Sequence, residues 1–194
     1  PICRMTLAIA LLHPGARARV PDYAYGEYAA AAEALGLRVV REIDDLDAKD
    51  PAWLIWHTEP GSPIGDARAA PPFHPGESVL VIDRAYAPLR LDGEAPPVPD
   101  DAWQLWSPNK ALGLTGVRGA YAIAPARTPE SAALTDWLTG RLAALAPSWP
   151  LGAHAVAMLQ CWASDEAQSW VRSSLHVLRS WRRQQLELCQ KRLG

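Results

Sequence analysis

Two short, continuous apolar runs constrain the fold of this chain more than any other feature of its sequence. They are AWLIWHT, residues 52–58, and SVLVID, residues 78–83. The turn cluster EPGSPIG follows the first run, and the second ends abruptly in a carboxylate, Asp83. Strands without polar alternation are typical of parallel sheets that are covered on both faces. These runs therefore predict an α/β fold with a mostly parallel sheet flanked by helices.

The other segments fit this architecture. The chain is expected to open with a helix that ends at the sequence HPG. A second helix is expected to begin at Asp22, which caps it, and to end at Gly36. Beyond Thr128, the expected cap of a third helix, the pattern is helical, with a buried helix over 151–163 and a long polar-faced one over 165–192. Further strands are expected at 16–20, 37–43, 103–106 and 120–124, and solvated or proline-rich loops at 44–50 and 88–100. We therefore expect an α/β core over 1–128 and a helical C-terminal stretch over 129–194.

Composition excludes several classes of function. A net charge of -2 and a pI of about 6.2 do not suggest a surface that binds nucleic acid. No apolar run approaches the roughly 20 residues of a membrane span, and no signal peptide is recognisable. The three cysteines form no CxxC pair, and the five histidines have no metal-ligand spacing. The expectation is a cytoplasmic protein with reduced thiols, without a metal, a membrane or a nucleic-acid partner.

Lys110 stands out because lysine is rare in this chain. Of the 19 basic residues only Lys49, Lys110 and Lys191 are lysines. The other two lie in charged or polar surroundings, whereas Lys110 precedes the mostly apolar, glycine-punctuated run ALGLTGV. A lysine amine can lose its proton and act as a nucleophile, whereas arginine stays protonated. Lys110 is therefore a candidate nucleophile, with a snorkelling surface lysine as the alternative.

Two polar residues follow predicted strands and are candidates for the same site. Asp83 ends one strand, and Ser107 comes directly after the strand at 103–106. Ligands of open α/β sheets bind beyond the carboxyl ends of the strands. We therefore expect Asp83, Ser107 and Lys110 to lie close together.

Three segments in order, GSPIG, VIDRAY and SPNKALGLTGVR, resemble the fold-type-I pyridoxal-phosphate (PLP) enzymes, the class I/II aminotransferases. Histidinol-phosphate aminotransferases and threonine-phosphate decarboxylases are the nearest in likeness. The family pattern D-E-A-Y corresponds to DRAY at 83–86. The pattern S-x-x-K followed by G-L-x-G-x-R is matched by Ser107, Lys110, Gly113, Leu114, Gly116 and Arg118.

The resemblance implies a PLP cofactor and assigns two residues to its reactive parts. Lys110 is similar to the lysine that forms a Schiff base with PLP and then moves a proton between substrate and cofactor. Asp83 is similar to the carboxylate that keeps the pyridine nitrogen protonated, so that the ring can act as an electron sink. The same carboxylate could also simply cap the turn after its strand.

Five further residues receive roles in holding the cofactor. Tyr86 resembles the phenol that hydrogen-bonds the cofactor's 3′ oxygen, and Ser62 stands where the family has an asparagine that contacts the same atom. Ser107 and Arg118 resemble phosphate ligands, although Arg118 could be a surface arginine. Tyr25 resembles the aromatic residue that stacks on the pyridine. The neighbouring tyrosines at 23 and 28 leave open which of the three are only core residues.

Two features separate the chain from the family pattern. Arg84 replaces the acid of D-E-A-Y, and Ser62 is a shorter donor than asparagine. The resemblance also covers only the large domain, so we expect the N-terminal arm and the small C-terminal domain to be absent. His57, within a buried run, is expected to be a hydrogen-bonded core residue.

The resemblance implies a PLP-dependent aminotransferase acting on an amino acid or amino-phosphate and a 2-oxo acid, and working as a homodimer. Two alternatives remain open. A threonine-phosphate decarboxylase is favoured by Trp149, because the related decarboxylases have a similar aromatic-proline segment near the site. A non-catalytic PLP-binding module is favoured by Ser62 and by the restricted extent of the match.

Overall fold

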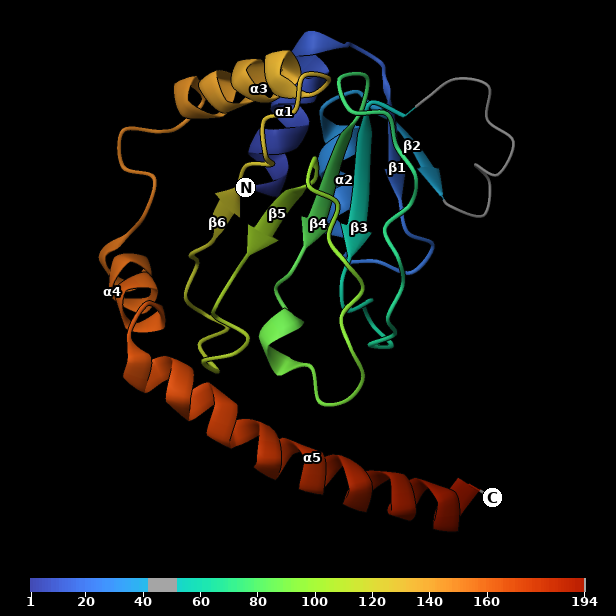
Figure 1. The fold of residues 1–194 in the computed structure, drawn as a ribbon, viewed down its shortest axis with the longest axis vertical. Helices are drawn as coiled ribbons and strands as arrows, with labels where there is room; N and C mark the ends of the chain where they lie inside the picture. Colours follow the sequence, from blue (N-terminus) through green and yellow to red (C-terminus); the bar gives the residue numbers. More distant parts are fainter. Residues whose placement is uncertain (42–51, 194) are drawn as a thin grey trace.

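A six-stranded sheet forms the centre of the computed structural model, which describes residues 1–41 and 52–193 (Figure 1). The strand order is β2-β1-β3-β4-β5-β6. The first five strands run parallel, and β6 is antiparallel to β5. The strands are β1 Arg17–Val20, β2 Arg38–Arg41, β3 Leu54–Thr58, β4 Val79–Asp83, β5 Trp103–Trp106 and β6 Tyr121–Ile123.

The helices are α1 Ile2–Leu12, α2 Glu27–Ala34, α3 Ala132–Ala144, α4 Ala153–Trp162 and α5 Asp165–Leu193, with a short 3-10 helix, η2 Ala87–Leu89. The expected fold class, a mostly parallel sheet with helices and a helical C-terminal stretch, is confirmed. Of the helices among the described residues, none is both long and apolar enough to cross a membrane.

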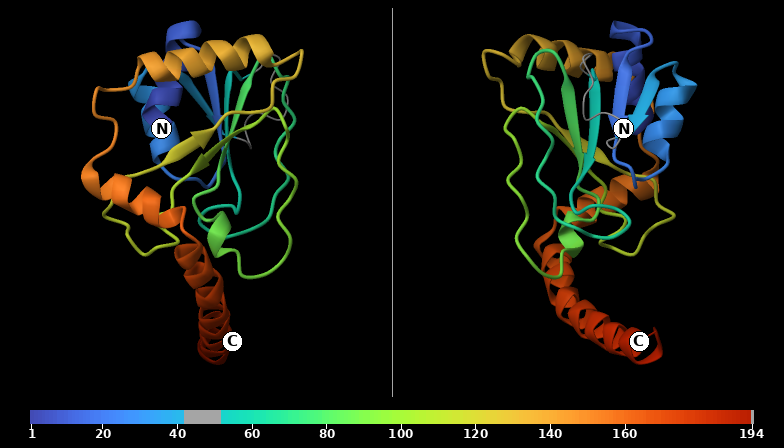
Figure 2. Two further views of the ribbon diagram at one scale, coloured as in Figure 1. Left: turned by 60° about the vertical axis from the view of Figure 1, so that its left-hand side comes forward. Right: turned by 90° about the vertical axis from the view of Figure 1, so that its right-hand side faces the viewer.

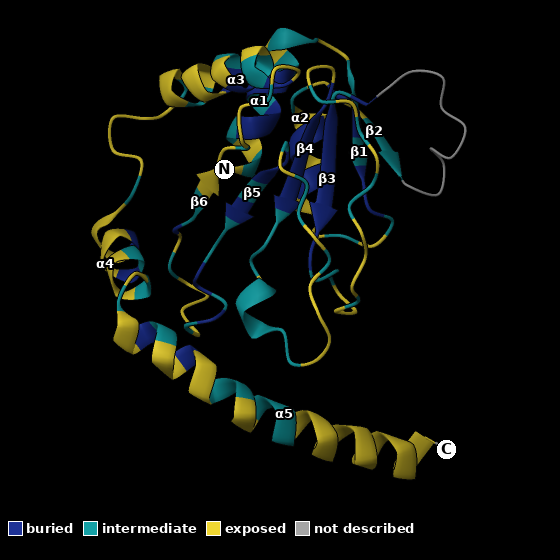
Figure 3. Cartoon of the chain, in the orientation of Figure 1, coloured by how far each residue is buried: buried dark blue, intermediate teal, exposed yellow. Residues whose placement is uncertain are grey.

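The two faces of the sheet are covered in different ways (Figure 2). On one face, α1, α2 and α3 pack side chains such as Ile9, Tyr28 and Leu138 against Trp56 and Val81 of the central strands. On the other face, Ile55, Leu80 and Ile82 are covered by Ala70, Phe73 and Val98, which lie in loops. The two apolar runs are therefore buried on both sides, as expected, and β3 is buried along its whole length (Figure 3).

Two helices begin later than the sequence predicts. The second helix starts at Glu27 and not at Asp22, and the Tyr28 N–H donates to the Tyr25 carbonyl where the helix begins. The third starts at Ala132, and Thr128 is in the preceding turn, where its hydroxyl donates to Asp101. The acidic run at 44–50 and the end of the strand expected at 37–43 lie outside the described residues.

The sequence predicts that α4 is buried, and this prediction is wrong. Only Ala155 and Met158 of α4 are buried, because the helix touches the rest of the molecule along a narrow line beside Gly119. The long helix α5 is polar-faced, as expected. It is joined to the loop after η2 by Arg179, whose Nε donates to the Leu91 carbonyl at 2.6 Å, and by an Arg182–Asp92 ion pair.

Candidate functional site

The carboxyl ends of β3, β4 and β5 meet at one edge of the sheet and border a cavity of about 260 Å³. This volume is of the order found for small-ligand sites. Residues far apart in sequence reach the cavity because parallel strands bring their carboxyl ends together. All seven site residues expected from the sequence line it: Tyr25, Ser62, Asp83, Tyr86, Ser107, Lys110 and Arg118.

Asp83, the last residue of β4, is held by hydrogen bonds to both carboxylate oxygens. Its Oδ2 accepts the hydroxyl proton of Tyr28 at 2.6 Å, and its Oδ1 accepts the N–H of Ala85 at 2.9 Å. The second bond is the turn-capping contact that the sequence left as an alternative. The carboxylate nevertheless borders the cavity, so capping and ligand binding are compatible.

Tyr28 is a site residue that the sequence did not single out from the neighbouring tyrosines. It is almost completely buried, and its ring stacks on Trp56 with the centroids 4.8 Å apart. Burial raises the pKa of Tyr28 well above its ordinary value, and the neighbouring Asp83 carboxylate raises it further. The phenol therefore stays protonated at neutral pH and donates its hydrogen bond to Asp83.

Lys110 lies in the turn that follows β5. Gly113 closes this turn with a φ of 67°, a left-handed conformation that glycine adopts without strain. The lysine is half-buried, and its Nζ lies 5.9 Å from the centroid of the Tyr86 ring. This is the outer range of a cation–π contact. Lys110 and Tyr86 thus lie side by side on the cavity wall.

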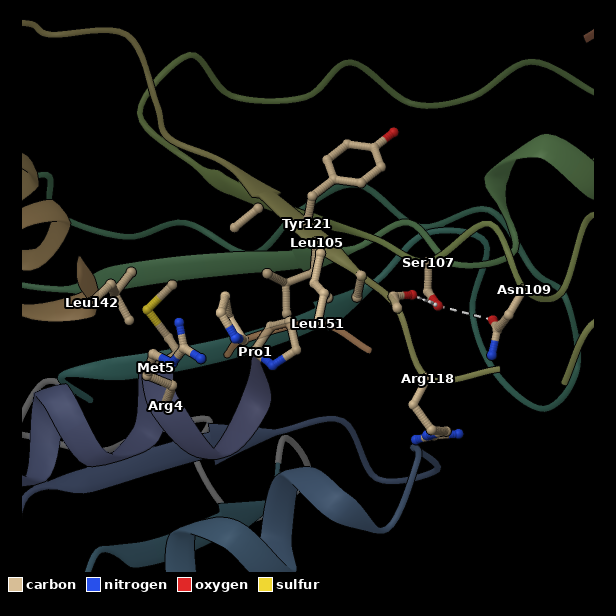
Figure 4. Close-up of a pocket in the computed structure, with 14 residues that line it drawn as sticks. Pro1, Arg4, Met5, Leu105, Ser107, Asn109, Arg118, Tyr121, Leu142 and Leu151 are labelled. Atoms are coloured by element: carbon tan, nitrogen blue, oxygen red, sulfur yellow. Dashed lines mark hydrogen bonds between the residues drawn. The ribbon is translucent and has the colours of Figure 1, made fainter. Parts of the chain in front are cut away.

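Ser107 and Arg118 lie where this cavity adjoins a second one of about 470 Å³. The Ser107 hydroxyl is 2.9 Å from Asn109 Oδ1 and 3.0 Å from the Gly119 carbonyl, either of which can accept its proton. Figure 4 shows Ser107, Asn109 and Arg118 at one end of the second cavity, with Met5 and Leu142 at the other. Arg118 is exposed, and within the described parts of the chain no carboxylate forms an ion pair with it. It is therefore available to an anion.

Two further contacts fix the loop that carries Ser62. Glu59 N–H donates to the Asp83 carbonyl at 3.0 Å, and the buried Glu59 carboxylate forms an ion pair with Arg90. These contacts tie the loop after β3 to the end of β4.

Tyr25 is half-exposed and meets Tyr28 edge-on, with ring centroids 5.9 Å apart. The sequence indicated neither the Glu59–Arg90 pair nor the edge-on contact.

Comparison with known proteins finds matches in structure and not in sequence. No family model matches the chain, and no curated protein sequence matches it. A PLP-bound putative aminotransferase from Clostridium difficile 630 superposes with a TM-score of 0.74 and 13% identity, covering 100% of this chain and 56% of that one. The chain therefore shares the fold of the part of this aminotransferase structure that it covers.

Two other solved structures extend this aminotransferase likeness. A putative histidinol-phosphate aminotransferase from Erwinia carotovora atroseptica matches with a TM-score of 0.67 and 16% identity over 97% of this chain and 60% of that one. The L-threonine-O-3-phosphate decarboxylase from Porphyromonas gingivalis matches with a TM-score of 0.59 and 17% identity over 82% and 51%. The chain thus spans between half and three fifths of the length of these aminotransferase-fold proteins, including both types that its motifs resemble.

Two residues considered from the sequence do not line this cavity. Trp149, in the connection between α3 and α4, is 90% exposed and does not line it. His57 is a buried strand residue whose Nε2 lies 3.2 Å from the Arg68 carbonyl, as expected of a core histidine. Among the described residues, no group of three His, Cys, Asp or Glu side chains could hold a metal.

Proposed function

We propose that this chain is the cofactor-binding part of a PLP-dependent aminotransferase. The observation that carries the proposal is the arrangement of Lys110, Asp83 and Arg118 around one cavity at the carboxyl edge of the sheet. Residues 1–128 supply the cofactor site, and residues 129–194 complete the same domain. Leu138 of α3 packs in the same core as the central strands, which supports the assignment of residues 129–194 to the same domain.

The residues around the cavity fit the chemical groups of PLP. The Lys110 amine matches the aldehyde, the Asp83 carboxylate the pyridine nitrogen, and Ser107 with Arg118 the phosphate. Tyr86 and Ser62 supply hydroxyl donors for the 3′ oxygen, and Tyr25 an aromatic face. When bound, PLP supplies an electron sink for the bonds at an amino acid's Cα.

The chain's own residues would have three tasks in the reaction. Lys110 would hold the cofactor through its amine and, as a free amine, would move a proton to and from the substrate's Cα. Asp83 holds a proton on the ring nitrogen, and Tyr28 fixes the direction of the carboxylate with its 2.6 Å hydrogen bond. Arg118 and Ser107 anchor the phosphate, so that the ring stays in position while Lys110 moves.

We further propose an amino acid or amino-phosphate and a 2-oxo acid as substrates, and a homodimer as the working assembly. The likeness to a histidinol-phosphate aminotransferase supports the phosphate-bearing class. The three cysteines have free, exposed thiols, which suit the reducing conditions of a cytoplasmic location.

Threonine-phosphate decarboxylation is the second candidate activity. The likeness to a structure of that enzyme favours it. Trp149 itself is exposed, and the adjoining Pro150 and Leu151 line the second cavity beside Ser107 and Arg118. The full-length enzyme separates the two activities: release of carbon dioxide without keto-acid formation identifies the decarboxylase. A non-catalytic module would bind PLP and form neither product.

Titration with PLP tests the proposed cofactor site. Wild type is expected to bind PLP, with a change in absorbance near the visible edge, and Asp83→Asn to bind roughly 10- to 100-fold more weakly, the value of a charge-assisted hydrogen bond. Asp92→Asn is the matched control, because Asp92 is exposed and lies outside the cavity lining. Equal PLP affinity of wild type and Asp83→Asn would refute the proposed role of Asp83.

A further inference from the structure

Two loops at the carboxyl edge of the sheet carry the hydroxyl groups proposed to meet the 3′ oxygen of PLP. Ser62 lies in the loop after β3, and Tyr86 lies in the loop after β4, directly before η2. Both residues line the proposed cofactor cavity, and both also line a third cavity of about 440 Å³. Residues 60–65 and 89–92 line this third cavity together, so the two loops do not pack against each other along this stretch.

Each of the two loops is held together by its own backbone hydrogen bonds. In the loop after β3, the Gly61 N–H donates to the Asp66 carbonyl, and the Gly65 N–H donates to the Gly61 carbonyl, both at 2.8 Å. In the loop after β4, the Leu89 N–H donates to the Tyr86 carbonyl at 2.9 Å. Each loop is therefore a compact unit, and the contact that joins the two units determines how their hydroxyl groups lie relative to each other.

The Glu59–Arg90 ion pair is that contact. Glu59 directly follows β3 and lies three residues before Ser62, whereas Arg90 directly follows η2 and lies four residues after Tyr86. The Arg90 guanidinium donates a hydrogen bond to the Glu59 carboxylate. In the described part of the chain, no other hydrogen bond joins residues 59–66 to residues 84–92.

The burial of this ion pair indicates that it contributes geometry more than stability. The Glu59 and Arg90 side chains are only 4% and 16% exposed. Removing both charges from water costs free energy, and packed apolar residues of similar volume often stabilise such a position equally well or better. Among the described residues, Glu59 Oε2 is buried without a hydrogen-bond partner, which adds to this cost. A guanidinium and a carboxylate, however, meet in a defined direction, which apolar side chains do not.

We propose that Glu59 and Arg90 are positioning residues that hold the Ser62 and Tyr86 hydroxyls where both can meet one oxygen atom of the cofactor. The inference rests on the proposed function, because it requires PLP in the cavity that Ser62 and Tyr86 line. Glu59 and Arg90 act through these two residues, since neither lines the cofactor cavity itself. The same ion pair keeps Tyr86 beside Lys110, whose Nζ lies 5.9 Å from the centroid of the tyrosine ring.

Hydrogen exchange of the chain without PLP tests whether the ion pair joins the two loops. Glu59→Gln keeps the length of the side chain and removes its charge. The backbone amides of residues 59–66 and of residues 84–92 should then exchange several-fold faster than in wild type, as measured by mass spectrometry. Asp92→Asn is the matched control, because it breaks an exposed ion pair at the end of the same loop and should leave exchange unchanged.

A PLP analogue that lacks the 3′ oxygen tests the positioning role. In the double variant Glu59→Leu with Arg90→Met, apolar side chains replace both charges, so the Tm should equal or exceed that of wild type. Its affinity for PLP should nevertheless fall about 10-fold, the value of one hydrogen bond, whereas its affinity for the analogue should match that of wild type. Glu59→Gln should show the same difference between the two ligands. A purely structural role would weaken the binding of both ligands equally.

The outcomes separate this inference from the proposed function. A wild type that binds no PLP overturns the proposed function and the positioning role together. A wild type that binds PLP leaves the proposed function in place. In that case the positioning role alone is overturned if both sets of variants bind PLP as wild type does, or lose PLP and the analogue equally. Unchanged exchange of the two loops in Glu59→Gln also overturns it.

Discussion

At the scale of single residues, the hydrogen bond from Tyr28 to Asp83 links the core to the proposed cofactor site. Tyr28 is clamped between Trp56 and the edge of Tyr25, and its hydroxyl reaches Asp83 Oδ2 at 2.6 Å. A buried ring positions its hydroxyl with little freedom, so the carboxylate is held in one direction before any ligand arrives. Such preorganisation is what a cofactor site requires.

We therefore expect Tyr28→Phe to weaken PLP binding. Removal of the hydroxyl frees Asp83 Oδ2 while the ring and its packing remain, and the lost bond to a charged group is worth about 1.5–3 kcal/mol. Equilibrium titration with PLP measures the effect. Tyr23→Phe, on a ring that is 75% exposed, is the control and should bind as wild type does. Equal affinities for all three proteins would contradict a positioning role for Tyr28.

Tyr28 should also make the fold sensitive to alkali. Its pKa in the folded chain is raised from an ordinary 10.0, by burial first and by Asp83 second. Above pH 10 the unfolded chain loses this proton while the folded chain keeps it, so the free energy of unfolding falls as pH rises, by up to about 1.4 kcal/mol per pH unit. Urea unfolding between neutral and alkaline pH should show a shallower fall for Tyr28→Phe than for Tyr23→Phe. Identical slopes would contradict this.

At the scale of elements, the sequence predicts the strands that bury the most apolar surface. The runs that became β3 and β4 have no polar alternation, and the strand ends correctly placed Asp83 and Ser107 at one edge. The partners of Asp83 were not predictable in the same way, because Tyr28 lies 55 residues away and looks like any core tyrosine. The antiparallel direction of β6 was also not predictable, since the sequence of a three-residue strand does not indicate whether it pairs parallel or antiparallel.

The contact between α4 and the start of β6 depends on Gly119. A Cβ at this position would lie 2.8 Å from Met158 Cε and 3.1 Å from Ala155 Cβ. We expect Gly119→Ala to destabilise the fold by about 1 kcal/mol, at the low end of overpacking costs, because Met158 Cε is the movable end of a flexible side chain. Denaturant unfolding measures this, and Met158→Ala should cost less in the Gly119→Ala background than alone. Strictly additive effects would contradict the close approach.

At the scale of the whole molecule, one α/β unit carries every residue proposed to hold the cofactor. The resemblance identified from three short motifs agrees with the fold found by structural comparison, although identity to the solved structures quoted is only 13–17%. The sequence did not predict that one face of the sheet would be covered by loops, because segments rich in proline and glycine give no periodic signal.

Binding of PLP to the folded state should raise the stability of the whole unit. A ligand at 100 times its dissociation constant contributes about 2.7 kcal/mol, which corresponds to a rise in Tm of roughly 5–10 °C for a chain of this size. Thermal unfolding followed by circular dichroism with increasing PLP measures the shift. Arg118→Ala should need more PLP for the same rise, whereas Arg127→Ala, an exposed arginine outside the cavity, should match wild type. A Tm that is independent of PLP would contradict a folded-state site.

Lys110 is the residue to which PLP is proposed to bond. The chain allows a direct measurement, because it contains only three lysines. PLP is added, the complex is reduced with borohydride, and the modified peptide is identified by mass spectrometry. The expected result is a reduced adduct on Lys110 in wild type and in Lys191→Arg, and loss of the adduct and of the absorbance near the visible edge in Lys110→Ala. Equal trapping of PLP by wild type and Lys110→Ala would contradict the claim.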